Sequence, residues 1–487
     1  MSVDVENCDV CIVGAGLAGM NALFVASRYL SPDQRIILVD RRQRVGGMWV
    51  DTYPYVRLHQ PHPMFTAGNI GWTLGQKPSH LASKDEVLGH FEHCLGVIKR
   101  HQRVDEFYGW AAESDEEADG IVRLTCRAED GRTMVIETPR LIKAYGVRVQ
   151  PNDPLELSSH GVHSVSPDSC DMRGAPIGDS TAPVWVVGGG KAAMDTVHTL
   201  LCAYPGREVN LVAGSGTLFN SRDRFFPEGM ARWRATMVST LASEVTRRFD
   251  GTNEDEVWDW HRATFGLWVT PETGNFLAGV LSEEERKTIA GGLNHVLMDH
   301  LVDVVDDAGG PRMMLRSGSS KPVEPGSWFV NCTGYLTNRD FPYEPYVSPS
   351  GKVLSIQPQS ATMHLTSYTA YFNTHLLFAG RIRDVPLYEL DMLGLYRKSR
   401  KAFAYTIFAL AQYNISLCAD NLPAKAFREC GIDFDRWYPL PRRALATVKF
   451  MRTHRGERDR LRGALDVVRE RYGVRCGPLG SDVAQAT

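Results

Sequence analysis

The chain has 487 residues, 43% of them hydrophobic, and 54 basic against 57 acidic residues give it a formal charge of −3. This length predicts two or three domains with cores of their own, and the near-neutral charge argues against a dedicated nucleic-acid binder, which needs a concentrated basic surface. Ten cysteines scattered along the chain favour reduced cytoplasmic thiols over a disulfide framework, and the acidic N-terminus is not typical of a signal peptide.

Residues 9–40 predict a strand, a glycine turn, a helix and a second strand. The apolar run 9–13 leads into GAGLAG at 14–19, and a second apolar run, 35–39, ends at Asp40. Residues 184–212 repeat this design around GGGKAA at 188–193. One such turn is a weak signal, whereas two, each between a strand and a helix, indicate two right-handed βαβ units that bind dinucleotides.

The remaining elements follow from hydrophobic periodicity and turn residues. Before the second unit, we expect an amphipathic helix at 85–100, strands at 104–110, 120–127, 133–138 and 140–146, and a linker at 151–182. After it, we expect a mostly helical insertion at 227–301, strands at 327–331 and 375–379, long helices from about 389 to 417, and a solvated, arginine-rich helix at 447–472.

These elements predict an α/β fold with two Rossmann-like, dinucleotide-binding domains, a helical insertion and C-terminal helices. The expected boundaries are 1–165 with 326–420 for a discontinuous first domain, 181–325 for the second domain, and 421–487 for a C-terminal helical extension.

The most apolar stretch, residues 402–418, contains Gln412, Asn414 and Ser416. It is also shorter than the roughly 20 apolar residues that a membrane-spanning helix needs. We therefore expect a cytoplasmic protein, with no membrane and no nucleic acid among its partners.

The first glycine turn has the features of a diphosphate cradle. A Cβ at Gly14 or Gly16 would obstruct the tight turn and the close approach of a diphosphate, and Gly19 lets the helix pack on the strand. Free N–H groups at the start of the helix would hold the diphosphate. Asp40 stands where a carboxylate accepts hydrogen bonds from ribose hydroxyls, which suits FAD or NAD. The alternative is a glycine turn without a ligand.

Several motifs around this turn resemble the flavin-containing monooxygenases and their Baeyer–Villiger relatives. They are Gly14-x-Gly16-x-x-Gly19, GGxW at 46–49, Tyr53-Pro54, Arg57-Leu58, Pro61, AYG at 144–146 and VNCTGY at 330–335, in the family's order over most of residues 8–390. The resemblance implies FAD in the first domain and a nicotinamide dinucleotide in the second. Beyond the glycines and Asp40, the residues expected to contact FAD are Leu17, Ala18, Arg41, Gly47, Met48, Trp49, Arg57, His59, Val104, Thr333, Gly334 and Gly380.

Disulfide reductases of similar architecture are excluded by the residues after the double glycine. They carry a redox-active cysteine pair there, whereas this chain has Trp49 and no further cysteine until Cys94. Cys8 and Cys11 form a CxxC, but they precede the turn on a predicted strand, where a buried structural role is expected.

The second glycine turn departs from the family pattern. Gly188, Gly190 and Ala193 fit GxGxxA, with Lys191 in the turn and Asp195 at the family's acidic position. No arginine follows the second strand to bind the 2′-phosphate of NADPH. The substitutes are Ser215, Ser221, Arg222 and Arg224. NADPH is favoured only slightly over NADH, and a vestigial domain without nicotinamide stays open.

The linker histidine His163 corresponds to the histidine of a third family signature. By itself, a lone linker histidine is more often structural. With the resemblance, it would couple nicotinamide binding to domain movement. Elsewhere, His62, His80, His93 and His101 lack ligand-like spacing, so no metal site is expected.

The expected chemistry follows from the resemblance. NAD(P)H would reduce FAD, and a flavin hydroperoxide formed with O2 would transfer one oxygen atom to a small organic substrate. Asn69 resembles the asparagine that the family places beside the flavin, although turn geometry explains it equally well. Glu389 and Asp391 either begin a helix aimed at the flavin or cap one.

The leading function is therefore an FAD-dependent, NAD(P)H-driven monooxygenase. A flavin-dependent oxidase or dehydrogenase with a vestigial nicotinamide site is the main alternative, and a scaffold with structural FAD is another. The substrate and the oligomeric state stay open, a homodimer included.

Overall fold

The computed structural model describes residues 4–147, 149, 151–334 and 341–480. Its first sheet is parallel and has the order β20-β8-β2-β3-β4. The bounds are β2 Val10–Val13, β3 Arg35–Asp40, β4 Arg103–Tyr108, β8 Leu141–Ala144 and β20 Val353–Ile356. Most strand residues are buried apolar side chains, as expected for a parallel sheet covered on both faces.

Helices cover one face of this sheet and a second sheet covers the other. The helices are α1 (Leu17–Ala26), α3 (Lys84–Lys99) and α9 (Thr366–Phe378), and α1 packs along both others. On the opposite face lie β1 (Asp4–Asn7), β5 (Trp110–Ala118), β6 (Ile121–Ala128) and β7 (Thr133–Thr138), in the order β1-β7-β6-β5. Their inward side chains form a core with Cys11, Val13 and Ile37.

The second glycine turn belongs to another parallel sheet, with the order β15-β11-β10-β19-β9. Its strands are β9 His163–Val165, β10 Val184–Val187, β11 Val209–Val212, β15 His295–Leu297 and β19 Trp328–Asn331. Helices α4 (Lys191–Ala203) and α8 (Glu283–Gly292) pack together beside it, and β16 (Leu301–Asp307), β17 (Gly310–Leu315) and β18 (Ser320–Pro322) form an antiparallel sheet. The two parallel sheets confirm the expected α/β class.

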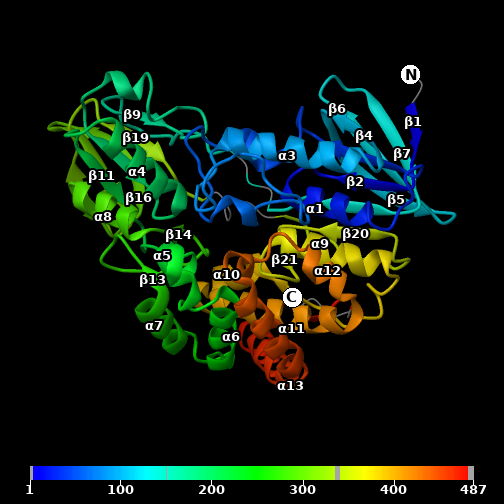
Figure 1. Cartoon of the computed structure of the whole chain (residues 1–487). Helices are drawn as coiled ribbons and strands as arrows, with labels where there is room; N and C mark the ends of the chain where they lie inside the picture. The colour runs from blue at the N-terminus through cyan, green and yellow to red at the C-terminus, as the bar shows by residue number, and fades with distance from the viewer. Residues whose placement is uncertain (1–3, 148, 150, 335–340, 481–487) are drawn as a thin grey trace.

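The expected insertion and the C-terminal helices pack together beneath both sheets (Figure 1). Helix α11 (Arg400–Asn421) lies at the centre and contacts α6, α7, α9, α10 and α13. The other helices of this layer are α5 Arg222–Phe225, α6 Val238–Arg248, α7 Glu254–Phe265, α10 Met392–Lys398, α12 Ala424–Glu429 and α13 Leu440–Tyr472. Two small sheets join it, formed by β12 Phe219–Ser221, β13 Gly266–Leu267 and β14 Val280–Leu281, and by β21 Ser360–Ala361, β22 Tyr388–Asp391 and β23 Cys476–Pro478.

Three placements correct the expectations from sequence. The strand predicted at 375–379 is wrong, because these residues continue helix α9 to Phe378. Almost every residue of α9 is buried, so its apolar run shows no helical period, and β20 is the strand beside β8. The helix predicted from Glu389 begins at Met392, with Asp391 as its N-cap. Strands β9 and β19 pair in the second sheet, whereas their residues were expected in the first domain.

Helix α11 is long and apolar enough to cross a membrane by length and composition, but 72% of its apolar window is buried inside the protein. Its polar residues have partners there. Asn414 is fully buried, accepts a hydrogen bond from the Tyr388 N–H at 2.9 Å, and donates to the carbonyls of Thr362 at 2.6 Å and Tyr388 at 2.7 Å. These bonds fasten α11 to the chain around β21 and β22.

We predict that Asn414→Leu lowers the free energy of unfolding by about 3 kcal/mol, because three buried backbone groups lose their partner. Urea unfolding followed by circular dichroism measures the change. Thr453→Ala on the exposed side of α13 is the control and should change stability by less than about 0.5 kcal/mol. A wild-type midpoint for Asn414→Leu contradicts the prediction.

Candidate dinucleotide sites

The first glycine turn brings three backbone segments into contact. Gly14 has a φ of +103°, and a Cβ there would lie 2.5 Å from the Ala144 carbonyl oxygen. A Cβ on Gly19 would lie 1.7 Å from the Gly14 carbonyl oxygen. Gly16 is the N-cap of α1 and has no side-chain cap. The first amides of α1, those of Leu17 and Ala18 included, are therefore available for an anion.

Asp40 closes β3 beside this turn and is 4% exposed. Its Oδ2 accepts a hydrogen bond from the Ala15 N–H at 2.6 Å, and its Oδ1 accepts one from the Arg42 N–H at 2.8 Å. Each carboxylate oxygen has a further lone pair for a ribose hydroxyl. The carboxylate thus holds the turn in shape and lies where the sequence predicts the ribose contact.

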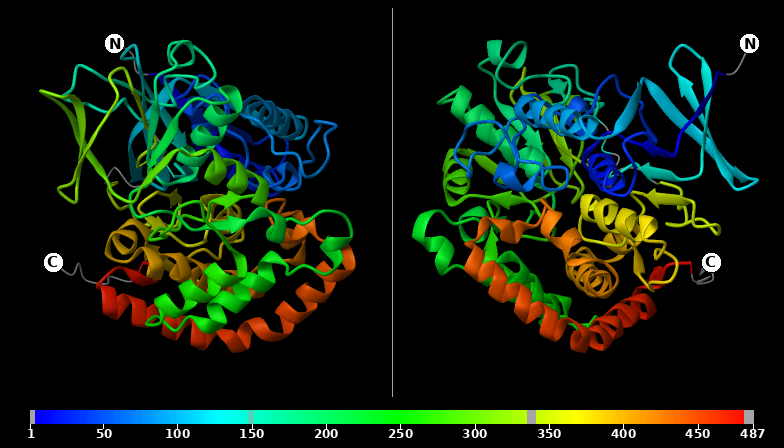
Figure 2. Two further views of the ribbon diagram at one scale, coloured as in Figure 1. Left: turned by 90° about the vertical axis from the view of Figure 1, so that its left-hand side faces the viewer. Right: turned by 45° about the vertical axis from the view of Figure 1, so that its right-hand side comes forward.

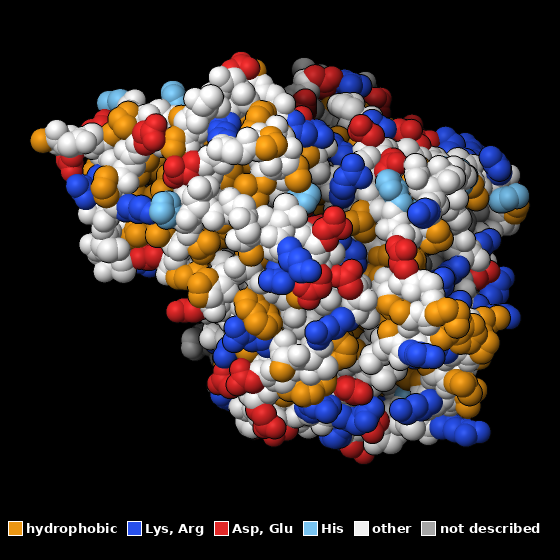
Figure 3. All heavy atoms as spheres, turned by 60° about the vertical axis from the view of Figure 1, so that its left-hand side comes forward, with side chains coloured by type: hydrophobic (Ala, Val, Ile, Leu, Met, Phe, Trp, Pro, Cys, Tyr) orange, Lys and Arg blue, Asp and Glu red, His pale blue; other side chains and the backbone are white. Residues whose placement is uncertain are grey.

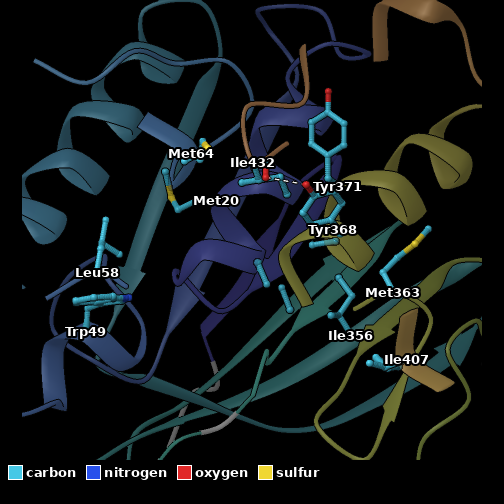
Figure 4. Packing of buried hydrophobic residues seen from close by; sticks show 14 of the residues in the cluster. Met20, Trp49, Leu58, Met64, Ile356, Met363, Tyr368, Tyr371, Ile407 and Ile432 are labelled. Atoms are coloured by element: carbon cyan, nitrogen blue, oxygen red, sulfur yellow. Dashed lines mark hydrogen bonds between the residues drawn. The ribbon is translucent and has the colours of Figure 1, made fainter. Parts of the chain in front are cut away.

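The double glycine lies directly on the turn. Gly46 N–H donates to the Ala15 carbonyl at 2.9 Å, and a Cβ on Gly47 would lie 2.6 Å from the Gly16 Cα. Gly47 has a φ of +57° and is followed by the short helix α2 (Met48–Asp51). In this helix Trp49 is buried against Phe65, with ring centroids 5.5 Å apart, and lies beside Leu58 (Figure 4). Met48 is exposed.

The strand register moves one of the predicted FAD contacts, Val104, away from the turn. Asp40 pairs with Tyr108, whereas Val104 pairs with Ile36 near the opposite end of the strands. Tyr108, not Val104, therefore lies at the edge with the glycine turn. The half-buried Tyr108 has its pKa raised by burial and by Glu106 and Asp40 nearby.

Gly380 follows the C-terminal end of α9. That end packs on the C-terminal end of α1, where Tyr29 and His375 share a hydrogen bond of 3.0 Å. The N-terminal end of α9 lies at the glycine-turn edge instead, because a Cβ on Gly146 would be 3.9 Å from Thr366 Oγ1. Helix α9, and not one starting at Glu389, thus directs its amides to this edge.

Asn69 lies in a loop that is fastened to α1. The buried Asn21 side chain donates to the Thr66 carbonyl at 3.2 Å and accepts from the Gly68 N–H at 3.0 Å. Gly68 has a φ of +51° and lies against the Phe24 ring. Asn69 itself is exposed, which favours the turn explanation over a donor enclosed in an apolar pocket.

The other residues predicted to contact FAD lie in separate parts of the structure. Arg41 is exposed, and Arg57 is exposed and donates to the Leu81 carbonyl at 3.2 Å. Thr333 follows β19 of the second sheet and accepts from Asn152 Nδ2 at 2.5 Å, and Gly334 comes next with a φ of +70°. Tyr335 lies outside the described residues.

The second glycine turn repeats the first in geometry. Gly190 is the N-cap of α4 with φ −85° and ψ −171°, the same values as Gly16, and it too has no side-chain cap. A Cβ on Gly188 would lie 2.5 Å from the Cys332 carbonyl oxygen, and Ala193 is fully buried. The altered residues of this turn therefore preserve a backbone cradle.

A loop of the first domain contacts the helix that follows this turn. Asp195 forms an ion pair with Lys191 and accepts a hydrogen bond from the Tyr53 hydroxyl at 2.8 Å. Tyr55 and Thr196 share a hydrogen bond of 2.8 Å. The Tyr-Pro-Tyr segment thus joins the two domains at α4.

A charged cluster lies next to this contact. Arg222 donates from Nε to the His59 carbonyl at 2.7 Å and pairs with Glu285 at 2.9 Å. Burial, with Lys191 and Arg222 nearby, lowers the pKa of His59 to about 3, so the imidazole is neutral at pH 7. Burial alone would raise the pKa of Glu285, but Lys191 and Arg222 hold it at about 2.

The residues proposed for a 2′-phosphate are mostly engaged elsewhere. Arg222 is in this cluster, Arg224 donates to the Thr264 carbonyl, and Ser221 is buried. Ser215 alone follows β11 directly, between Gly214 and Gly216.

Arg400 at the start of α11 supplies a cation at this position. Its guanidinium donates to Ser215 Oγ at 2.9 Å. The His300 ring lies over Gly214, whose Cβ would be 3.1 Å from Nε2. Burial lowers the pKa of His300, and the charges of Arg316 and Arg400 lower it further. Arg400 is 185 residues from Ser215, and no local pattern in the sequence could have indicated this pairing.

The remaining candidates, His163 and Cys11, pack against other residues of the two sheets. The His163 ring lies 4.6 Å from the Trp328 ring, and its strand β9 pairs with β19. Cys11 is fully buried in β2. No group of three or more His, Cys, Asp or Glu side chains among the described residues could hold a metal ion.

The fold and the two cradles define a class: α/β proteins with two dinucleotide-binding domains. No protein-family model matches the chain. An uncharacterized protein of Mycobacterium tuberculosis is 30% identical over 352 residues, which are 67% of this chain and 60% of that protein. The chain thus spans about 60% of the length of the first curated relatives that it matches.

Relatives with a named activity match shorter segments. The putative FAD-containing monooxygenase MymA of Mycobacterium tuberculosis is 41% identical over 64 residues, 13% of this chain and 12% of that protein. The FAD-dependent monooxygenase rstn6 of Aspergillus nomiae is 27% identical over 213 residues, 40% of this chain and 36% of that protein. These partial matches agree with the resemblance inferred from the motifs: over these segments, the chain is similar to proteins named as FAD-dependent monooxygenases.

Solved structures similar to this chain include a flavin-containing monooxygenase from Stenotrophomonas maltophilia, with a TM-score of 0.46 and 13% identity, covering 77% of this chain and 99% of that one. An open form of cyclohexanone monooxygenase has a TM-score of 0.49 and 12% identity, covering 85% and 93% of the two chains.

We predict that Glu285→Gln lowers the free energy of unfolding at pH 7 by about 2–3 kcal/mol, because Lys191 and Arg222 lose a charged partner. The glutamine still accepts the Ser282 N–H bond of the α8 capping box. The folded-state pKa lies below the ordinary value. The contribution is therefore complete above about pH 4.5 and is lost as the pH falls towards 2.

Urea unfolding of both proteins at pH 7, about pH 4 and about pH 3 measures this difference and its loss. Glu283→Gln, whose partner Arg286 is on the same helix, is the control and should cost less than about 1 kcal/mol. A difference that grows as the pH falls would contradict the assignment.

Proposed function

We propose that this protein is an FAD-dependent, NAD(P)H-driven monooxygenase that transfers one oxygen atom from O2 to a small organic substrate. The observation that carries the proposal is the pair of glycine cradles with the same N-cap geometry, one of them beside Asp40. The sequence similarity to named FAD-dependent monooxygenases supports the reaction class.

FAD fits the first cradle. Its diphosphate would lie on the uncapped amides of α1, where a Cβ on Gly16 would intrude. Asp40 would accept the ribose hydroxyls through its remaining lone pairs. Tyr108 at the same edge, and not Val104, would border the adenosine half. Bound FAD would supply the hydride and oxygen chemistry, while this chain orients it and excludes water.

The isoalloxazine end would lie between Trp49 and the N-terminal end of α9. Both elements are anchored: Trp49 by its contact with Phe65, and α9 by the bond from the Tyr368 hydroxyl to the Ile432 carbonyl at 2.7 Å. Partial positive charge at the start of α9 would stabilise negative charge on the reduced ring. Asn69 as an oxygen-side donor stays a prediction.

The nicotinamide dinucleotide fits the second cradle, on α4. The intact backbone geometry there favours a working nicotinamide site over a vestigial one, and thus a monooxygenase over an oxidase. We propose Ser215, His300 and Arg400 as the site of the 2′-phosphate, which favours NADPH over NADH. The cytoplasmic location stays an expectation.

Spectra of the purified protein test the proposal. We expect bound flavin, bleaching by NADPH without oxygen, and substrate-coupled oxygen consumption. A colourless protein that does not bind added FAD would overturn it. Flavin reduced by an organic substrate, with no response to either nicotinamide, would establish the oxidase or dehydrogenase alternative.

We predict that Asp40→Ala weakens FAD binding by about tenfold to a hundredfold, because two charge-assisted hydrogen bonds to the ribose are lost. Flavin fluorescence during titration of the FAD-free protein gives the dissociation constant. Asp105→Ala on the neighbouring strand β4 is the control and should bind FAD as the wild type does. Unchanged affinity in Asp40→Ala would refute the ribose contact.

Arg400→Gln should weaken NADP⁺ binding by about tenfold while leaving NAD⁺ binding unchanged, because a guanidinium contact to phosphate is lost. Isothermal titration of the oxidised protein with NADP⁺, NAD⁺ and 2′-phospho-AMP separates the two effects. Arg428→Gln, an exposed arginine of α12, is the control. Equal losses for both dinucleotides would show a general role in packing.

A further inference from the structure

Large apolar side chains gather at the surface where helix α13 begins. Among the described residues, twelve large hydrophobic side chains are exposed, and half of them lie here. The set, called the α13 patch below, consists of Met230, Trp233, Leu440, Leu445, Val448 and Met451. Leu440 and Leu445 are 70% and 72% exposed. Such a concentration on one surface is typical of an interaction site.

The two segments of the patch, the start of α13 and the 3-10 helix before α6, are joined by hydrogen bonds. Leu445, Val448 and Met451 recur every third residue along α13 and so share a face. The 3-10 helix Gly229–Trp233 is fastened beside them, because Arg442 donates to the Arg232 carbonyl at 2.7 Å and to the Ala235 carbonyl at 2.7 Å. In Figure 2, this green segment lies next to the orange half of α13.

Unpaired cations border the patch. Arg234, Lys449 and Arg452 are exposed and form no ion pair within the described parts of the chain. The C-terminal half of α13 differs, because its arginines pair with Asp420, Glu457, Asp459, Asp466 and Glu254. Figure 3 shows hydrophobic and basic side chains side by side at the lower right of the molecule. The exposed acid Glu228 precedes the 3-10 helix.

We propose that the α13 patch docks the protein on the surface of an anionic lipid bilayer. An interfacial helix inserts apolar side chains among the acyl chains while its Lys and Arg side chains bind lipid phosphates. Trp233 is of the residue type that favours the headgroup region. This inference replaces the expectation that no membrane is involved.

The cations favour a bilayer over a second copy of the chain. A two-fold dimer through this patch would gather the cations of both copies at one interface. Its like charges would repel, whereas anionic lipids neutralise them. Docking by this surface would not require either dinucleotide, so its test is independent of the proposed reaction.

Co-sedimentation of the full-length protein with vesicles tests the proposal. We expect binding to vesicles of phosphatidylcholine with 30% phosphatidylglycerol, about tenfold weaker binding to pure phosphatidylcholine, and weakening by added salt (~0.5 M). Lys449→Glu with Arg452→Glu should reduce binding about tenfold or more. Leu445→Ser with Met451→Ser should reduce it similarly, because the insertion of two exposed apolar groups is lost.

The matched control is Lys77→Glu with Lys287→Glu, two exposed lysines elsewhere that change the net charge equally. It should bind vesicles as the wild type does. Thermal unfolding should be unchanged in all three double variants. Absence of vesicle binding, or equal loss in the control, overturns the proposal. A dimer that only Leu445→Ser with Met451→Ser dissociates, without vesicle binding, would assign the patch to self-association instead.

Discussion

The contact between two backbone segments at Gly16 and Gly47 is the constraint on which the first site depends. With no Cβ on either residue, the Gly46-Gly47 loop rests directly on the turn, and its position is held by the Ala15 carbonyl. That leaves the amides of α1 bare at one edge of a parallel sheet, where Asp40 and the start of α9 also lie. A methyl group at either position would separate the segments and disturb the edge that the proposed cofactor needs.

Polar contacts connect the two domains at the second cradle. Tyr53 donates to Asp195, and Arg222 binds the His59 carbonyl while it pairs with Glu285. These groups are largely shielded from solvent, so each charge needs its partner. The same segment that follows the double glycine of the first site therefore positions the helix of the second.

The helical layer beneath the sheets supplies one residue to the second dinucleotide site and also forms the exposed α13 patch. The start of α11 supplies Arg400 to the loop after β11, and residues 213–218 of that loop include no arginine. Helix α13 covers α11 with its C-terminal half and exposes the apolar patch with its N-terminal half. A protein docked by that surface would hold its dinucleotide domains at a defined orientation to the bilayer.

The sequence alone determined the two βαβ units, both glycine cradles, Asp40 and the amphipathic helix at α3, because each depends on neighbours within about 30 residues. It could not place α9, whose buried faces have no period, nor exclude Val104, because only the register of β3 with β4 decides which residue reaches the edge. Arg400 is identified as a candidate only in the folded structure, where it contacts Ser215, a residue 185 positions earlier in the chain. Local patterns encode elements and turns, whereas contacts between distant segments depend on how those elements pack.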